Sequence, residues 1–232
     1  MAAETSDAVH ELESQLLEAA LRHASRLGWN GRLMAAAAAE AGVDPSLAGL
    51  ILPAGARDLA ALLAARHDRK ALERLAAIDP AGLKVRERIR AAVLARCDAA
   101  RADGEAVRRW MGFLLLPANA GLGLRLAWAS ADALWRWAGD VAVDENHYSK
   151  RALLAEILVS AQAIDIHSGR GAAERHLDRR IGQVMAFERL KGRLRGSRAE
   201  RLAGMLGGWR YGRGPASPEA TSARSPASSS SP

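Results

Sequence analysis

An all-α fold is predicted by the composition of the chain and by the spacing of its apolar residues. Ala, Leu and Arg dominate the 232 residues, aromatic residues make up only 4%, and β-branched residues are sparse. Ala, Leu and Arg are strong helix formers. Ala and Leu recur at intervals of three and four residues over most of the chain, which places them on single faces of helices. A chain of this length buries roughly 70% of its unfolded surface, enough for a helical domain with its own core.

The first segment, residues 14–75, has the outline of a helix-turn-helix. Apolar residues recur at helical spacing up to Gly28, and Gly42 is followed by the capping residues Asp44 and Pro45. Four helices are expected, at residues 14–27, 33–41, 45–52 and 58–75, the last opened by Asp58. A longer helix followed by two short helices with a glycine turn is typical of a helix-turn-helix. The order resembles the N-terminal domain of TetR-type regulators.

The third helix of this segment lacks the chemistry of a DNA-recognition helix. Its sequence, D-P-S-L-A-G-L-I-L-P, contains neither a cation nor an amide side chain. Recognition helices use such side chains to contact base edges and phosphates. Glu40 and Asp44 flank the turn, where they would repel phosphates. We therefore expect no nucleic-acid partner, and keep as the alternative function a TetR-like transcriptional regulator that senses an apolar effector.

The second segment, residues 76–195, is predicted to be a helical body. Its first helix, at residues 80–104, alternates charges on the solvent face, and its buried stripe is expected to be Val85, Ile89, Ala92, Val93 and Arg96. Further helices are expected at residues 106–116, 124–138, 145–167 and 172–190. A break separates the second and third helices of the body at residues 117–123. In the helix at 124–138, helical spacing predicts one apolar face formed by Leu124, Trp128, Ala131 and Trp135.

The C-terminal part of the chain is basic, whereas the body is near neutral. Residues 1–168 contain 20 Lys and Arg against 21 Asp and Glu, and residues 169–232 contain 13 against 5. Such a segment favours contact with an anionic surface. Residues 197–211 are predicted to form an amphipathic helix on an anionic membrane. Its membrane-binding residues are expected to be Arg198, Arg201, Leu202, Met205, Leu206, Trp209 and Arg210.

Two alternatives apply to this end of the chain. The basic segment could be a solvated, weakly ordered tail, or its helix could pack back on the body. Residues 212–232 are rich in Ser and Pro, bury no core and are predicted to be disordered.

Composition and motifs disfavour an enzyme. The single Cys97 excludes an internal disulfide and fits a reducing compartment. The six histidines share no metal-ligand spacing with acidic residues, and neither a G-x-S-x-G motif nor a P-loop occurs. No apolar run approaches the ~20 residues that span a bilayer, and the acidic N-terminus is not a targeting signal. We expect a non-enzyme without cofactor or metal, in the cytoplasm or bound peripherally to a membrane.

Residues 113–158 are the most informative stretch, because they contain three of the six Trp and a leucine run interrupted by Pro and Gly. Such a break prevents smooth helix packing and can leave an apolar cavity. The candidates for lining it are Leu114, Leu115, Pro117, Leu122, Leu126 and Trp128. The alternative is that these are ordinary core residues of a helical bundle.

A second group of candidates surrounds the turn between the helices at 124–138 and 145–167. Here aromatic residues adjoin charged ones, a composition typical of interface hot spots. The group consists of Asp132, Leu134, Trp135, Asp140, Asp144, His147, Tyr148 and Arg151. Their alternative role is helix capping and a local ion pair, with Asp144 as the N-cap.

Three blocks with fixed mutual spacing resemble a known family. They are L-L-L-P-A-N at residues 114–119, A-D-A-L-W-R-W-A-G-D at 131–140 and D-E-N-H-Y-S-K-R-A-L-L at 144–154. They are similar to the signature region of the ninth coenzyme Q biosynthesis accessory protein, a family of lipid-binding proteins of ubiquinone synthesis. The resemblance covers residues 16–209. Two positions depart from the family pattern, with Ala118 in place of a His and His147 in place of a Trp.

The resemblance implies a TetR-like helical fold without DNA binding, an apolar cavity for isoprenoid lipids and a C-terminal helix that docks on membrane. It also implies a homodimer and a partner enzyme, the di-iron demethoxyubiquinone hydroxylase, which the second group of candidates would contact. We expect an accessory protein that binds an isoprenoid quinone or a precursor, associates with the inner membrane of a bacterium and presents the lipid to that hydroxylase. A membrane-associated scaffold without a specific ligand is a third possibility.

Overall fold

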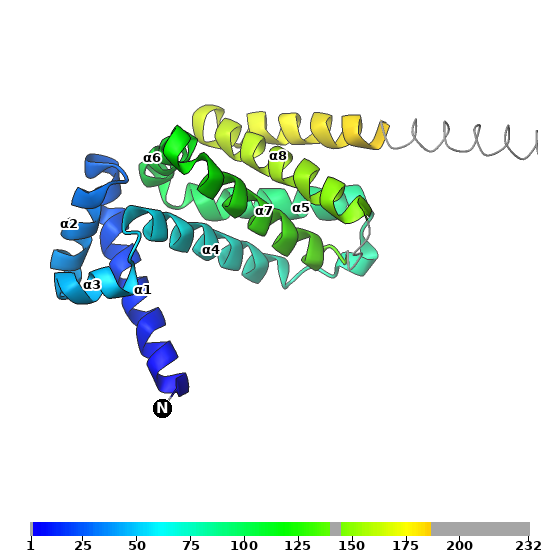
Figure 1. The fold of residues 1–232 in the computed structure, drawn as a ribbon. Coiled ribbons are helices and arrows are strands. Elements are labelled where there is room, and N and C mark those ends of the chain that lie inside the picture. Colours follow the sequence, from blue (N-terminus) through cyan, green and yellow to red (C-terminus); the bar gives the residue numbers. More distant parts are fainter. Residues whose placement is uncertain (1, 140–144, 187–232) are drawn as a thin grey trace, which may run out of the picture. The chain divides into compact units, whose positions relative to one another are not determined.

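A computed structural model describes residues 2–139 and 145–186 of the chain (Figure 1). Every regular element within these residues is a helix, so the predicted all-α fold is confirmed. Residues 1–183 form one compact unit, and a second unit begins at residue 184. The expected boundary between residues 75 and 76 therefore lies inside a single compact unit. The TetR-like arrangement stays a prediction.

Local capping sets the limits of the first helices, which are α1 (Ala2–Leu27), α2 (Gly31–Ala41) and α3 (Pro45–Ile51). The side chain of Asn30 accepts hydrogen bonds from two backbone N–H groups at the start of α2, so this helix begins two residues earlier than predicted. Gly42 ends α2 with a φ of 66°, in the left-handed region that favours glycine. Asp44 caps α3 as predicted. α1 begins well before residue 14, because the preceding Ala and Glu residues favour helix without contributing an apolar stripe.

The fourth helix, α4 (Ala56–Leu75), also begins two residues before its predicted start. Asp58 is not its N-cap; from within the first turn it accepts a hydrogen bond from the backbone N–H of Ala54 at 2.6 Å. The buried face of α4 contacts α1, α5 and α7. Its members include Leu59, Ala60, Leu63, Ala64, His67 and Ala71.

Two elements replace the single helix predicted over residues 80–104. They are the 3-10 turn η1 (Pro80–Gly82), whose N-cap is Asp79, and the helix α5 (Val85–Arg101). Four members of the predicted stripe, Ile89, Ala92, Val93 and Arg96, are buried. Val85 is 50% exposed because it is the first residue of the helix, so its predicted burial is wrong. The next helix, α6 (Gly104–Leu115), lies where it was expected.

The predicted break before the seventh helix is too long. Only η2 (Pro117–Asn119) separates α6 from α7 (Ala120–Trp137), so Gly121 and Gly123 belong to the helix. The predicted apolar face is also wrong, since Leu124 is 74% exposed and, of its four members, only Ala131 is fully buried. The buried side chains of α7 are instead Leu122, Ser130, Ala131 and Leu134. Two apolar stripes run along this helix, and spacing does not show which of them meets the neighbouring helices.

The eighth helix, α8 (Glu145–Ser168), is followed by Gly169, whose φ is 80°. A further helix is described from residue 170 to residue 186, and its residues 170–183 run back along α8 (Figure 1). Arg180 pairs with Glu156 at 2.6 Å across these two helices. The four helices α4, α5, α7 and α8 pack side by side, which places the interior of the bundle between them (Figure 1).

Two buried tryptophans join the first three helices to the rest of the unit. The indole N–H of Trp29 donates to the carbonyl oxygen of Ala106 on α6 at 3.1 Å. The indole N–H of Trp110, also on α6, donates to the carbonyl oxygen of Ala60 on α4 at 3.0 Å. Both rings belong to one apolar cluster with residues of α1, α2, α3 and α4. The helix-turn-helix segment and the body therefore share a core.

None of the described helices is by itself both long enough and apolar enough to cross a bilayer. Taken together, α3 and α4, which meet at a bend of 59°, satisfy that test by length and composition.

Candidate functional site

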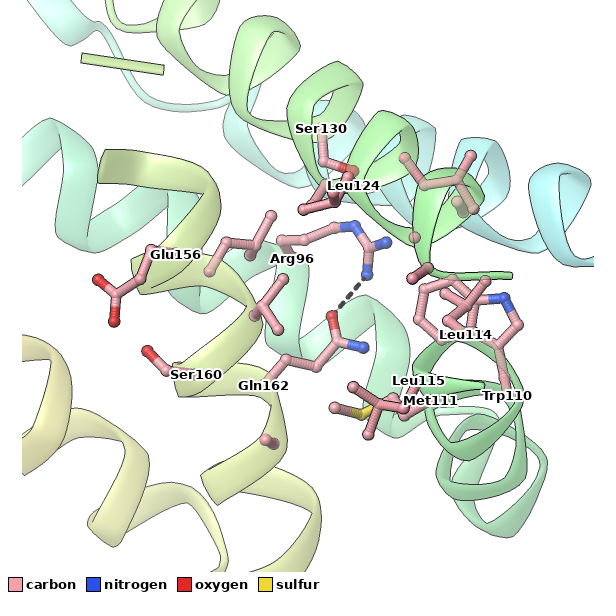
Figure 2. A pocket seen from close by; sticks show the side chains of 18 residues that line it. Arg96, Trp110, Met111, Leu114, Leu115, Leu124, Ser130, Glu156, Ser160 and Gln162 are labelled. Atoms are coloured by element: carbon pink, nitrogen blue, oxygen red, sulfur yellow. Dashed lines mark hydrogen bonds between the residues drawn. The ribbon is translucent and has the colours of Figure 1, made fainter. Parts of the chain in front are cut away.

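A cavity of about 560 Å³ lies between α4, α5, α6, α7 and α8 (Figure 2). Its volume falls in the range of small-molecule pockets, about 300–1,000 Å³. Most of its wall is apolar, and the apolar lining includes Ala64, Trp110, Met111, Leu114, Leu115, Leu124, Leu126, Ala127, Leu158, Val159 and Ala163. The cavity therefore suits a ligand with a large apolar part.

The mouth of the cavity lies where α6 ends and α7 begins. Leu115 and Leu124 line the cavity and are 78% and 74% exposed, so its wall continues to the solvent there. Gly123 on α7 lies next to Leu114 on α6, and a Cβ atom at this position would be in van der Waals contact with the carbonyl oxygen of Leu114, at 3.4 Å. The apolar leucines at this edge are accessible to a ligand entering from outside.

Three polar side chains form the inner end of the cavity, here called the polar floor: Arg96, Ser130 and Gln162. Each is at most 5% exposed. Arg96 Nε donates to Asp68 Oδ1 at 2.6 Å, and its Nη1 donates to Gln162 Oε1 at 3.2 Å (Figure 2). The Ser130 hydroxyl donates to the other carboxylate oxygen of Asp68 at 2.8 Å. Asp68 on α4 thus balances the charge of Arg96 from behind the floor.

The remaining polar residues of the wall, Glu156 and Ser160 on α8, have partners in the neighbouring helix. Glu156 pairs with Arg180. The Ser160 hydroxyl donates to the carbonyl oxygen of Ile157 at 3.1 Å and lies 2.9 Å from His176 Nε2. These two side chains therefore serve contacts between helices rather than the interior of the cavity.

The structure places the six predicted lining residues in two groups. Leu114, Leu115 and Leu126 line the cavity. The other three do not: Pro117 is exposed at the start of η2, and Leu122 is a core residue with 6% exposure. Trp128 instead faces Tyr148, with the ring centres 6.1 Å apart. The pattern of the break identified the right region but not which side chains point inward.

The predicted partner-binding residues include a buried ion pair. Arg151 is 2% exposed, and its Nε donates to Asp132 at 2.5 Å. Asp132 also pairs with Arg136 at 2.6 Å. Leu134 is fully buried. Asp132 and Arg151 therefore join α7 to α8, and Leu134 belongs to the core. Their role in partner binding stays a prediction.

The aromatic members of the same group lie closer to the surface. The indole N–H of Trp135 donates to the carbonyl oxygen of Lys150 at 3.0 Å, and the Lys150 ammonium lies 5.8 Å from the centre of the Trp135 ring. Tyr148 is 66% exposed. Asp140, Asp144 and the side chain of His147 lie outside the described residues, as do the predicted membrane-binding residues between Arg198 and Arg210.

Several residues of the cavity were not recognised as site residues from the sequence. The sequence pattern assigns Arg96 only to a buried stripe, and it does not single out Val159, Gln162 and Ala163 on α8 as lining residues. The spacing of three and four residues from Val159 to Gln162 and Ala163 carried a signal, because it places these side chains on one helical face. The isolated Gln among apolar residues gave no separate signal.

Two buried groups outside the cavity, His67 and Cys97, have strongly shifted pKa values. Burial lowers the pKa of His67 to about 4, against the opposing effect of Asp103, whose Oδ2 lies 2.6 Å from His67 Nε2. Burial raises the pKa of the Cys97 thiol to about 12, so this thiol stays neutral and unreactive. In the part of the chain that the structure describes, no three His, Cys, Asp or Glu side chains are grouped to hold a metal ion.

Part of the chain that forms the cavity is similar to a known protein family. The sequence model of the COQ9 family matches residues 120–188. Residues 120–188 are therefore similar to the COQ9 family. This region comprises α7, α8 and the helix that follows, and it supplies Ser130 and Gln162 of the polar floor. The family resemblance predicted from the three sequence blocks is confirmed.

Curated COQ9 proteins are similar over a longer stretch. The chain is 25% identical over 189 residues to the mitochondrial ubiquinone biosynthesis protein COQ9-A of Xenopus laevis, covering 76% of this chain and 59% of that protein. The COQ9 protein of Xenopus tropicalis gives the same identity and coverage. The COQ9 protein of Rattus norvegicus is 29% identical over 102 residues, covering 43% of this chain and 33% of that protein. The chain thus spans about 59% of the length of the first two relatives.

Proposed function

We propose that this protein is a non-catalytic accessory protein of ubiquinone biosynthesis that binds an isoprenoid quinone or a precursor in the cavity. The observation that carries the proposal is the apolar cavity between α6, α7 and α8, with its mouth edged by exposed leucines. The COQ9 region forms two of these three helices, and the relatives are named for ubiquinone biosynthesis. An isoprenoid chain matches an apolar wall because its burial removes apolar surface from water.

Filling the cavity should remove the lipid and leave the fold intact. Ala127 on α7 lines the cavity, so the ring of Ala127→Phe would occupy space that a lipid needs. We expect isoprenoid lipid to be recovered from the purified wild-type protein by organic extraction and mass spectrometry, and its yield per mole of the variant to fall at least about tenfold, the result of losing roughly 1.4 kcal/mol of binding. The helical circular dichroism should be unchanged.

Ala129→Phe is the matched control, because Ala129 is exposed on the same helix and does not line the cavity. This variant should keep the wild-type lipid yield. Equal yields from both phenylalanine variants, or a wild-type protein that carries no lipid and retards duplex DNA, would contradict the proposal.

The proposal includes the demethoxyubiquinone hydroxylase as the partner that receives the lipid. The surface that supports it is the pair of Trp128 and Tyr148. About one turn further along α7 and α8, the ion pair of Asp132 and Arg151 joins the same two helices. An aromatic side chain that is accessible and fixed on a rigid support loses little entropy on binding. The proposal further includes a homodimer and peripheral binding to anionic membrane through residues 197–211.

Tyr148→Ala should weaken capture of the hydroxylase by the immobilised protein several-fold. Because Tyr148 is 66% exposed, the melting temperature should fall by no more than a few degrees. Tyr148→Phe retains the ring and should capture the enzyme nearly as well as wild type. If Tyr148→Ala captures the enzyme like wild type, this surface is not the contact.

A further inference from the structure

We propose that the polar floor selects a ligand with an uncharged head group that carries oxygen acceptors, and that this head group occupies the inner end of the cavity while the apolar chain runs to the mouth. The inference rests on the proposed function, since it assigns a polar subsite within the same cavity. It adds the residues that contact the head group and the direction in which the ligand lies.

The floor offers hydrogen-bond donors. A guanidinium has five N–H donors and a glutamine amide has two. Arg96 donates through Nε to Asp68 and through Nη1 to Gln162. Among the described residues, no acceptor is bonded to Arg96 Nη2 or to the amide nitrogen of Gln162. Both residues are at least 95% buried and line the cavity (Figure 2). Because both residues line the cavity, these donors are open to it. An apolar ligand that displaces water from them would leave them unpaired, which is destabilising, so a matching ligand must bring oxygen acceptors.

The charge of the floor favours a neutral head group over an anionic one. Arg96 is already paired with Asp68, whose second oxygen accepts from Ser130, so the group as a whole carries no net charge. A carboxylate or phosphate placed beside it would be buried without a counter-charge of its own, which is strongly unfavourable. A carbonyl or ether oxygen accepts the same hydrogen bonds and brings no charge. Quinones and methoxylated phenols have such oxygens.

The polarity of the two ends sets the orientation. The inner end holds the buried donors, whereas the mouth is edged by Leu115 and Leu124, which are mostly exposed. A head group at the mouth would leave the donors of the floor unsatisfied and would place polar atoms against leucine. Since the cavity measures about 560 Å³, a long polyprenyl chain extends beyond it through the mouth.

Variants at Gln162 test the subsite. Gln162→Leu removes the amide donor. Gln162→Glu replaces that donor with an acceptor and keeps an oxygen that accepts from Arg96. The second variant therefore still tests the subsite if the first does not fold. The probes are a short-chain ubiquinone, the hydrocarbon squalene and oleate, each measured by native mass spectrometry. For wild type we expect ubiquinone to bind more tightly than oleate. Both variants should lose about tenfold in ubiquinone affinity, the effect of one buried hydrogen bond, and keep their affinity for squalene.

Gln183→Leu is the matched control, because it makes the same change of side chain at an exposed residue that does not line the cavity. It should bind all three probes like wild type. Three results would overturn the subsite and leave the lipid-binding function standing. The first is wild-type affinity for ubiquinone in both folded Gln162 variants, and the second is an equal loss of affinity for ubiquinone and squalene. The third is tighter binding of oleate than of ubiquinone by the wild type. A wild-type protein that binds neither ubiquinone nor squalene would overturn the proposed function together with the subsite.

Discussion

Asp68→Ala is expected to lower the free energy of unfolding by about 3 kcal/mol, because it leaves a buried arginine without its counter-charge. Arg96 is 2% exposed, and Asp68 accepts hydrogen bonds from both Arg96 and Ser130. No other carboxylate among the described residues pairs with Arg96. Urea unfolding followed by circular dichroism measures the change.

Asp178→Ala provides the comparison for this result. Asp178 pairs with Arg90 at 2.8 Å, but their side chains are 55% and 41% exposed. Exposed pairs contribute about 0–1 kcal/mol, so this variant should unfold close to wild type. If the two alanine variants were destabilised equally, the Asp68 pair would contribute no more than a surface ion pair.

Acidification is expected to remove about 3 kcal/mol of stability through His67 alone. The folded protein holds His67 neutral, with a pKa near 4, whereas the unfolded chain has the ordinary value of 6.5. Between these values the unfolded chain binds a proton that the folded protein does not. The contribution is therefore complete above pH 6.5 and is lost as the pH falls towards 4.

His67→Gln removes this titration, because its side chain does not titrate. It also removes a contact that, against the effect of burial, lowers the pKa of Asp103, so the comparison reports the pair of His67 and Asp103 together. Urea unfolding of both proteins at several pH values between 4 and 6.5 gives the free energy of unfolding as a function of pH, and the wild type should show the steeper dependence. Arg22 lowers the pKa of Glu40, and Arg170 lowers the pKa of Glu174. Protonation of these two carboxylates on acidification lowers the stability of wild type and variant by the same amount. Parallel pH dependences of the two proteins would show that His67 is not held neutral in the fold.

Features that depend on neighbouring residues in the chain could be predicted from the sequence. Asp44 caps α3 through backbone groups two and three residues away, and Gly42 takes the left-handed conformation that ends α2. Both effects are local and need no knowledge of the rest of the fold. The start of α4 was misplaced for a related reason: Asp58 is a good N-cap by type, yet its carboxylate bonds the backbone N–H of Ala54 from inside the helix.

Features that depend on which helices meet could not be predicted in this way. Leu122 and Leu124 are equally apolar and both lie on α7, but one is 6% and the other 74% exposed. Their difference is set by the direction from which neighbouring helices approach, and the helical period does not contain that information. The same applies to Gln162, which reaches Arg96 across 66 residues of sequence. The region of the cavity was therefore predictable, while its polar floor was not.

The hydrogen bonds around Asp68 join one side chain from each of four helices, with Asp68 on α4, Arg96 on α5, Ser130 on α7 and Gln162 on α8. If α4 moves away, Arg96 and Ser130 both lose the carboxylate that accepts their hydrogen bonds. If α5 moves away, the hydrogen bonds of Arg96 to Asp68 on α4 and to Gln162 on α8 are both broken. Because each partial opening strands a polar group in an apolar interior, the intermediate arrangements are less favourable than either the closed or the fully opened bundle. The four helices are thereby coupled into one cooperative unit, which separates as a whole rather than one helix at a time.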